Sequence, residues 1–196
     1  MHIIAFTGKA GSGKDTAANI LIEKYGFIKI SFAASLKDAV AAIFSWPRDM
    51  LEGSTAESRA WREQKDEWWS NRLSMNITPR HILQTWGTEL CRDGFHEDIW
   101  IASLEKKLVC FPATTNIVIT DCRFENEAAV IHKLGGKIIQ IDRSSIDSES
   151  KHSSELGISQ NTTDIIIYNK GTLEELEFAI ECTIEPIVRH KKSEQT

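Results

Sequence analysis

A glycine-rich loop between a short apolar run and an amphipathic stretch restricts the fold of this chain more than any other feature. The run His2–Thr7 is apolar and β-branched and predicts a strand, and Thr16–Tyr25 has apolar residues at helical spacing. Between them, Gly8 is followed after four residues by Gly13-Lys14, the spacing of a Walker A loop. Strand, loop and helix in this order are the context that the motif requires. We therefore interpret the loop as an ATP-binding site rather than a fortuitous turn.

The residue types of this loop suit a phosphate ligand. Glycines let the backbone curl so that successive N–H groups point at phosphate oxygens, and the helix N-terminus adds a favourable dipole. Lys14 supplies a positive charge for the β- and γ-phosphates. We expect the following residues to contact ATP: Gly8, Lys9, Gly11, Ser12, Gly13, Lys14, Asp15 and Thr16.

One position departs from the Walker A pattern. Asp15 follows the lysine where Ser or Thr is usual, and Thr16 comes next. This form is similar to that of nucleoside monophosphate kinases, in which the hydroxyl is shifted by one position. The usual hydroxyl ligand of Mg²⁺ is thereby displaced, and we expect Asp15 to hold the waters of the metal or to lie near the phosphate acceptor.

Short apolar runs alternate with helical patterns along the rest of the chain. Four more strands are predicted, at residues 27–32, 116–120, 137–141 and 164–168, with helices at 125–134 and 173–188. Nearly all-apolar strands are typical of parallel sheets covered on both faces, so the pattern predicts an α/β fold with an open five-stranded sheet. Residues 34–108 are mostly helical in pattern. We interpret them as a helical insertion within a single domain, residues 1–196, rather than a second independent domain.

The bulk composition excludes several classes of protein. A net charge of −5 and a pI near 5.7 argue against a nucleic-acid polymer as ligand. Apolar runs are too short for a membrane helix, and the first residues lack the pattern of an export signal. We expect a cytoplasmic protein. Its four cysteines are far apart in sequence, which favours buried thiols over a metal site or disulfides.

An acidic residue follows the predicted strand at 116–120. In P-loop proteins such a carboxylate helps to hold Mg²⁺, so Asp121 is a candidate metal ligand; an ordinary helix cap is the alternative. Arg123 and Glu127 lie four residues apart at the start of the next helix and share a face. Arg123 is expected to pair with Glu127 or with a phosphate, and a plain surface ion pair is the alternative.

The acceptor side has weaker signals. Lys37 lies early in a helix after the second strand and could reach an anion or remain solvated. Thr78 and Pro79 begin a helix in which Arg80 occupies the first turn, where acids are preferred, and a bound phosphate would remove this conflict. Gln84, four residues on, could read a base edge, although a plain amphipathic helix is the alternative. Trp100 could stack on a base or fill the interior.

Several segments together resemble bacteriophage-type deoxynucleoside monophosphate kinases. They occur in order over the chain: residues 8–16, 31–37, 78–92, Trp100, 121–127, His152-x-Ser154-Glu155 and 169–173. The resemblance implies transfer of the ATP γ-phosphoryl group to a dNMP with Mg²⁺. It also implies a sheet of order 2-3-1-4-5, an acceptor-binding region at 34–108 and a lid at 143–157.

The resemblance also implies roles for single residues. Lys14 would bind the donor phosphates, and Arg80 and Arg123 the acceptor or transferring phosphate. Asp121 would lie near metal and acceptor, and Glu127 would orient Arg123. Partners would be small-molecule substrates, with no nucleic-acid polymer and no membrane, and a homodimer is left open.

Two other readings compete with this hypothesis. Another small-molecule P-loop kinase, of the phosphomevalonate or dephospho-coenzyme A type, would share the donor loop. A non-kinase switch protein would hydrolyse ATP slowly and use residues 34–108 as a partner surface.

Overall fold

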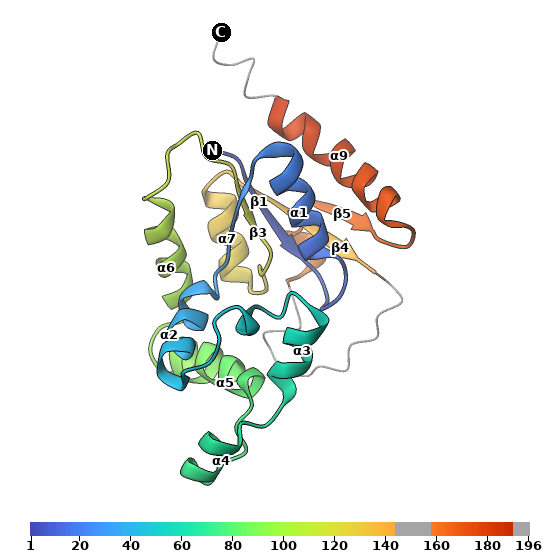
Figure 1. Cartoon of the computed structure of the whole chain (residues 1–196). Helices are drawn as coiled ribbons and strands as arrows, with labels where there is room; N and C mark the ends of the chain where they lie inside the picture. Colours follow the sequence, from blue (N-terminus) through green and yellow to red (C-terminus); the bar gives the residue numbers. More distant parts are fainter. Residues whose placement is uncertain (144–157, 190–196) are drawn as a thin grey trace. The chain divides into compact units, whose positions relative to one another are not determined.

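Five parallel strands form the sheet of the computed structural model, which describes residues 1–143 and 158–189 (Figure 1). The strands are β1 (Ile3–Thr7), β2 (Ile28–Ile30), β3 (Ile117–Ile119), β4 (Lys137–Asp142) and β5 (Ile165–Tyr168). Their order is β2-β3-β1-β4-β5, and every neighbouring pair is parallel. This order confirms the predicted α/β fold class.

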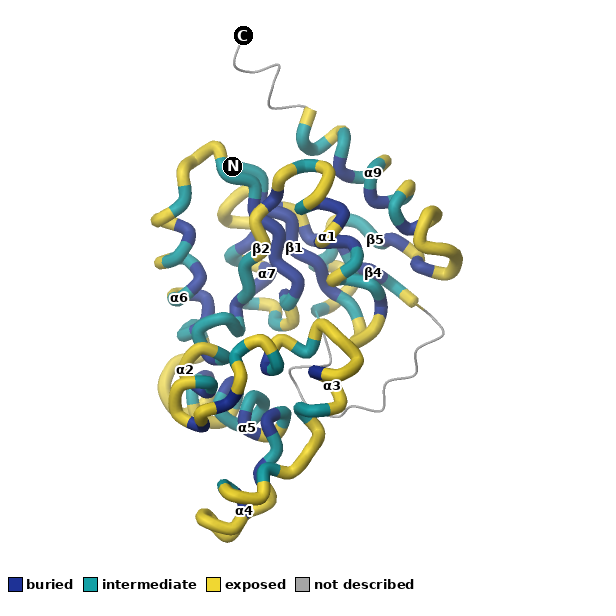
Figure 2. Tube along the Cα trace, viewed as in Figure 1, coloured by how far each residue is buried: buried dark blue, intermediate teal, exposed yellow. Residues whose placement is uncertain are grey.

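The central strands are buried on both faces, which explains their nearly all-apolar sequences. All five residues of β1 and all three of β3 are buried, and β1 appears dark blue in Figure 2. Ile3 of β1 pairs with Ile117 of β3, and Phe6 pairs with Ile139 of β4. Because all strands are parallel, the segments that follow β1, β2 and β3 emerge at one edge of the sheet.

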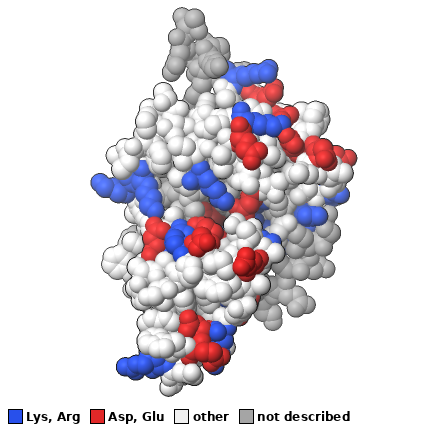
Figure 3. All heavy atoms as spheres, in the orientation of Figure 1, with Lys and Arg blue, Asp and Glu red and all other residues white. Residues whose placement is uncertain are grey.

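Three helices pack on this sheet: α1 (Lys14–Tyr25), α7 (Glu125–Lys133) and α9 (Leu173–Arg189). Helices α1 and α9 share an apolar cluster with alternate residues of the strands, including Phe6, Leu21 and Ile180, each fully buried. On the surface, Lys24 of α1 forms ion pairs with Glu177 and Glu181 of α9. Figure 3 accordingly shows basic and acidic side chains side by side in this region.

The chain divides into two compact units, and the second comprises Phe32–Leu108. Its elements are α2 (Ala34–Phe44), the 3-10 turn η1 (Met50–Glu52), α3 (Ala56–Glu63), α4 (Glu67–Leu73), α5 (Pro79–Thr85), the π-helical segment η2 (Trp86–Asp93) and α6 (Ile99–Leu108). The first unit, Met1–Ser31 with Val109–Thr196, holds the sheet and the short turn η3 (Gln160–Thr162).

Aromatic rings hold the second unit together. Phe44 at the end of α2 stacks on Trp46 with ring centroids 4.4 Å apart, and Trp69 and Trp86 lie 4.9 and 5.4 Å from Phe44. The indole N–H groups of Trp46 and Trp69 donate hydrogen bonds to Asp66 and to the Phe44 carbonyl. Aromatic rings with satisfied polar atoms form a stable small core, so these tryptophans have a structural role.

Two simpler features complete the fold. Among the described residues, no helix is long and apolar enough to cross a membrane. The cysteines are all free thiols, but only Cys122 is buried, whereas Cys110 and Cys182 are exposed. The expectation of buried thiols is therefore wrong for these two, because α9 and the segment after α6 turn them outward.

Candidate active site

The phosphate loop connects β1 to α1 and requires glycine at several positions. Gly8, Gly11 and Gly13 have φ angles of 132°, 77° and 109°, a range that residues with a side chain rarely adopt. A Cβ atom on Gly8 would lie 2.3 Å from the carbonyl oxygen of Ile141 in β4. The loop therefore lies directly on the sheet backbone, and its glycines meet both a conformational and a steric requirement.

Lys14 is folded back onto this loop. Its Nζ donates hydrogen bonds to the carbonyl oxygens of Gly8 at 2.8 Å and Lys9 at 2.7 Å. Burial and the nearby Arg123 cation lower the pKa of Lys14 to about 8, although Asp15 and Asp121 act in the opposite direction. The lysine is thus a partly desolvated cation that is held in place by backbone oxygens.

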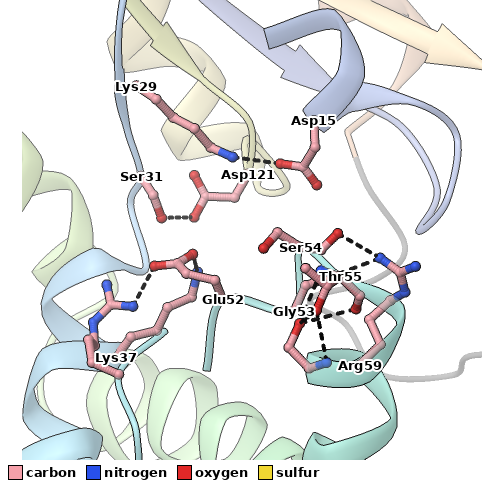
Figure 4. A network of polar contacts seen from close by, with 12 residues as sticks. Asp15, Lys29, Ser31, Lys37, Glu52, Gly53, Ser54, Thr55, Arg59 and Asp121 are labelled. Carbon is pink, nitrogen blue, oxygen red and sulfur yellow. Dashed lines mark hydrogen bonds and ion pairs between the residues drawn. The ribbon is translucent and has the colours of Figure 1, made fainter. Parts of the chain in front are cut away.

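Two polar pairs lie at the edge of the sheet beside the loop (Figure 4). Lys29 in β2 forms an ion pair of 2.6 Å with Asp15 at the start of α1. Ser31, directly after β2, donates a hydrogen bond of 2.7 Å to Oδ2 of Asp121, which follows β3. The two acids that the sequence singled out are therefore each held by a side chain from the β2 segment, and neither Lys29 nor Ser31 was predicted to do this.

Glu127 shapes the segment that carries Arg123. Glu127 is 2% exposed, and its carboxylate accepts hydrogen bonds from the backbone N–H of Arg123 at 2.8 Å and of Phe124 at 3.1 Å. These bonds satisfy the free N–H groups at the start of α7. Glu127 was expected to orient Arg123, and its contacts include this hydrogen bond to the backbone of that residue. Burial raises the pKa of the thiol of Cys122, the residue before Arg123, and so keeps this thiol protonated.

The oxygen donors near the loop suit Mg²⁺. Within residues 1–143 and 158–189, no three side chains of the His, Cys, Asp or Glu types cluster as a preformed metal site. Mg²⁺ is usually held by one or two carboxylates together with substrate phosphates and water. Asp121, with the hydroxyl of Thr16 at the start of α1, matches such a sparse set of hard oxygen ligands.

Asn169 is a residue that the sequence analysis did not single out as part of the site. It directly follows β5, and its side-chain Nδ2 donates a hydrogen bond of 2.8 Å to the carbonyl oxygen of Ser12 in the phosphate loop. Asn169 also borders an open pocket of about 310 Å³, near the lower limit for small-molecule sites. The pocket is lined by Tyr168, Asn169, Lys170, Gly171, Glu175 and Leu176.

In the second unit, Lys37 and Glu52 form the centre of a charge network. Lys37 of α2 donates a hydrogen bond of 2.5 Å to Glu52 (Figure 4). Arg48 forms ion pairs with both Glu52 and Asp38. Burial alone would raise the pKa of Glu52, but Lys37 and Arg48 outweigh it and lower this pKa. The cation of Lys37 is thus neither solvated nor remote from other charges, contrary to the alternative of a free surface lysine.

The helix that begins at Thr78 has the predicted cap. Oγ1 of Thr78 accepts a hydrogen bond of 3.1 Å from the His81 N–H, with Pro79 at the first helical position. Arg80 forms an ion pair of 2.8 Å with Glu63 of α3, so a carboxylate offsets the unfavourable cation at this helix start. Gln84 lies on the same helix and is half-buried.

Trp100 of α6 is part of the interior of the second unit. It is 9% exposed, and its indole N–H donates a hydrogen bond of 2.8 Å to the Gly87 carbonyl. Such burial favours the structural reading over stacking on a base. The predicted lid at residues 143–157 lies outside the described residues except for Arg143, which is exposed.

The family described as deoxynucleotide monophosphate kinase matches residues 48–180. A protein of Acanthamoeba polyphaga mimivirus, described as a candidate deoxynucleotide monophosphate kinase, is 37% identical over 89% of this chain and 92% of its own length. The chain belongs to the deoxynucleotide monophosphate kinase family.

Two bacteriophage relatives are more distant. The deoxynucleotide monophosphate kinase of Enterobacteria phage T4 is 22% identical over 94% of this chain and 99% of its own length. The deoxynucleoside-5′-monophosphate kinase of Escherichia phage T5 is 26% identical over 67% of this chain and 72% of its own length. The family resemblance predicted from the motifs is thereby confirmed.

Membership in the deoxynucleotide monophosphate kinase family makes the chain an ATP-dependent phosphotransferase. The segment that the family matches starts after the phosphate loop and includes the Arg80 helix, the Asp121–Glu127 segment and Asn169. The family model and the donor-loop geometry therefore rest largely on different residues of this kinase.

Proposed function

We propose that this kinase transfers the γ-phosphoryl group of ATP to a deoxynucleoside monophosphate, with the residues described above in the roles that follow. The observation that carries this proposal is the arrangement around Lys14. Its desolvated ammonium is bound to the phosphate loop and interacts electrostatically with Arg123 and Asp121. A site that combines a backbone cradle with the cations Lys14 and Arg123 and the acids Asp15 and Asp121 suits a polyphosphate chain that accumulates charge at its terminal group.

Phosphoryl transfer asks this chain for position and charge rather than covalent chemistry. The transition state is loose, with negative charge spread over the equatorial oxygens. In the proposed cycle Lys14 exchanges the carbonyl oxygens of Gly8 and Lys9 for the β- and γ-phosphates. Arg123 neutralises the transferring group, and the Glu127 carboxylate fixes the backbone that carries Arg123. The acceptor phosphate is already an anion at neutral pH, so the step needs no general base.

A divalent cation completes the proposed donor site. Mg²⁺, when bound, neutralises charge on the β- and γ-phosphates. Asp121 would hold it directly or through water, and its orientation is set by Ser31. Thr16 offers a hydroxyl oxygen. Asp15 is paired with Lys29, so its proposed role is to hold the waters of the cation or to stand near the acceptor.

The acceptor is proposed to bind through the second unit. Lys37 and Arg80 are cations that carboxylates of the same unit hold in place, Glu52 and Glu63 respectively. An incoming phosphate can replace such a carboxylate without leaving a buried charge unpaired. Gln84 has both a donor and an acceptor and can pair with a base edge. Trp100 is proposed to support the Gly87 backbone within this region rather than to stack on the base.

Acceptor-dependent ADP release tests this function. Wild-type protein is given ATP and Mg²⁺ with a panel of acceptors: dGMP, dTMP, dCMP, dAMP, the corresponding ribonucleotides, phosphomevalonate and dephospho-coenzyme A. We expect stimulation by one or more dNMPs and formation of the dNDP. Stimulation by phosphomevalonate or dephospho-coenzyme A alone, or ADP release that no acceptor changes, would contradict the proposal.

The catalytic roles are tested by Lys14→Ala and Arg123→Ala. Each should lower kcat/KM by about two to three powers of ten, the scale for losing one preorganised charge-stabilising group. Lys133→Ala in the last turn of α7 and Arg189→Ala at the end of α9 are the matched controls, and both should keep wild-type turnover. Near-normal turnover in both site variants would contradict the catalytic roles assigned to Lys14 and Arg123.

A further inference from the structure

The phosphate loop is held from two sides by segments that lie far away in the sequence. Gly8 rests on the Ile141 carbonyl of β4, where a Cβ would come within 2.3 Å of the oxygen. On the other side, the Asn169 amide donates its 2.8 Å bond to the Ser12 carbonyl. Asn169 is 8% exposed, and its own N–H donates a bond of 2.7 Å to the Asp142 carbonyl. Its backbone is thus fixed at the end of the sheet.

The bond from Asn169 sets the direction of one particular peptide group. In a trans peptide the C=O and the following N–H point in opposite directions. The Ser12 carbonyl points at Asn169, so the N–H of Gly13 points away from it. Gly13 is the N-cap of α1 and adopts a φ of 109°, and a Cβ there would lie 2.7 Å from the Asn169 Nδ2. The amide and the glycine therefore fit each other closely.

We propose that Asn169 is a positioning residue of the phosphate loop, which it orients through the Ser12 carbonyl. The proposal rests on the proposed function in that the loop binds the donor phosphates. It assigns to Asn169 no contact with the phosphates. Its effect is to hold the Ser12–Gly13 peptide in the one orientation that presents an N–H group to an anion in the loop, so that the bound geometry exists before the donor arrives.

A direct contact with the nucleoside is the competing explanation, because Asn169 also borders the pocket after β5. The two explanations differ in what they predict for a ligand without a nucleoside. Inorganic tripolyphosphate has the phosphate chain of ATP and no sugar or base. A loop-positioning residue affects ATP and tripolyphosphate equally, whereas a nucleoside contact affects ATP alone.

The experiment measures Kd for Mg-ATP and Mg-tripolyphosphate by isothermal titration calorimetry with the full chain. Asn169→Ala should weaken both ligands by the same factor, about tenfold, the value of one lost hydrogen bond. Asn169→Asp cannot donate to the Ser12 carbonyl at neutral pH and adds a negative charge, so both ligands should weaken further. Loss of ATP affinity with unchanged tripolyphosphate affinity in either variant would overturn the proposal, as would unchanged affinity for both.

A stability control separates positioning from general loosening. Ile167→Val removes a methylene from a buried residue of β5 that is 6% exposed, and it does not touch the loop bond. This variant should lower Tm and leave both Kd values unchanged. Equal weakening in Ile167→Val and Asn169→Ala would show that the effect comes from stability alone and would also overturn the proposal.

The outcome of the tripolyphosphate titration does not depend on which acceptor the kinase phosphorylates. If wild-type protein phosphorylates no dNMP while Asn169→Ala still weakens tripolyphosphate, the acceptor assignment fails and the positioning role stands. If dNMPs are phosphorylated while the variants bind tripolyphosphate normally, only the positioning role fails.

Discussion

Ser31 donates a hydrogen bond of 2.7 Å to Oδ2 of Asp121 and so joins the segment after β2 to the segment after β3. The last residues of these strands, Ile30 and Ile119, are paired in the sheet, which brings the two segments together. The bond restricts the rotation of the carboxylate that is proposed to hold Mg²⁺. Orientation of a metal ligand by such a neighbour commonly affects both affinity and rate.

Replacing Ser31 by Ala should therefore impair the metal site without removing its carboxylate. We expect kcat to fall by about fivefold and the half-saturating Mg²⁺ concentration to rise, because one hydrogen bond contributes about 1 kcal/mol. Steady-state assays over a range of Mg²⁺ concentrations measure both effects. Ser103→Ala, which loses a bond of 2.6 Å to Ser35 in the second unit, is the matched control. Unchanged Mg²⁺ dependence in Ser31→Ala would argue against Asp121 as a ligand.

Gly8→Ala should abolish donor binding. Its Cβ would lie 2.3 Å from the Ile141 carbonyl, a backbone atom that cannot move without distorting β4, and the φ of 132° adds strain. Gly26→Ala, at the end of α1, is the control, because its φ is 66° and no atom lies within 4 Å of the added Cβ. That change should cost about 1 kcal/mol of stability and leave the Kd for ATP unchanged. Thermal melting and calorimetry distinguish the two, and equal behaviour of both variants would contradict the steric account.

ATP affinity should depend on pH through Lys14, whose pKa is lowered to about 8 by burial and by Arg123. As the pH rises above about 8, the free enzyme loses this ammonium, and Kd should increase by up to about tenfold per pH unit. Binding above this pH should take up a proton, which calorimetry in buffers of different ionisation enthalpy detects. Lys14→Arg stays charged, so its residual affinity should lack this dependence. A flat wild-type profile between pH 7.5 and 9.5 would refute the shift.

The same pKa shift affects folding stability in the opposite direction, because stability increases as the pH rises whereas ATP affinity decreases. The folded pKa of about 8 lies below the ordinary value of 10.5, so the unfolded chain binds more protons between these values. The contribution of Lys14 is destabilising below about pH 8, and this penalty disappears as the pH rises towards 10.5. Lys14→Met, which removes the charge, should therefore raise Tm at pH 7 relative to wild type by more than it does at pH 10. An equal shift at both values would mean that the lysine is not desolvated.

Arg80→Ala should act on the acceptor and not on the donor. We expect the KM for the dNMP to rise by about tenfold or more while the KM for ATP stays near wild type, because charge-assisted hydrogen bonds to a phosphate are worth about 1.5–3 kcal/mol. Arg72→Ala at the end of α4, an exposed arginine of the same unit, is the control. A rise in the KM for ATP alone would place Arg80 on the donor side and contradict the proposal.

Local sequence patterns were sufficient for the elements of the donor site. The strand before Gly8, the loop and the helix from Lys14 follow from apolar spacing and glycine positions that act over a few residues. The Thr78 cap was predicted correctly for the same reason, since its partner His81 is only three residues away. The sheet order came from the resemblance to a family and not from these patterns.

Local sequence patterns did not predict contacts between residues that are distant in the sequence or the burial of single side chains. Sequence spacing put Glu127 on one face with the Arg123 side chain, but it did not predict that the carboxylate accepts hydrogen bonds from the backbone N–H groups that open α7. The sequence allowed Trp100 either to stack on a base or to fill the interior. In the structure its indole N–H donates a hydrogen bond to the Gly87 carbonyl, and the ring lies in the interior. Cys110 and Cys182 were expected to be buried and are exposed, because burial depends on packing that composition does not specify.

The sequence by itself determined where a phosphate can bind, because that property lies in a continuous loop whose glycines and lysine act locally. The tertiary structure decided how the loop and its acids are held. Ser31 reaches Asp121 across 90 residues, and Asn169 reaches Ser12 across 157. Such bonds exist only once parallel strands bring their carboxyl ends to one edge of the sheet.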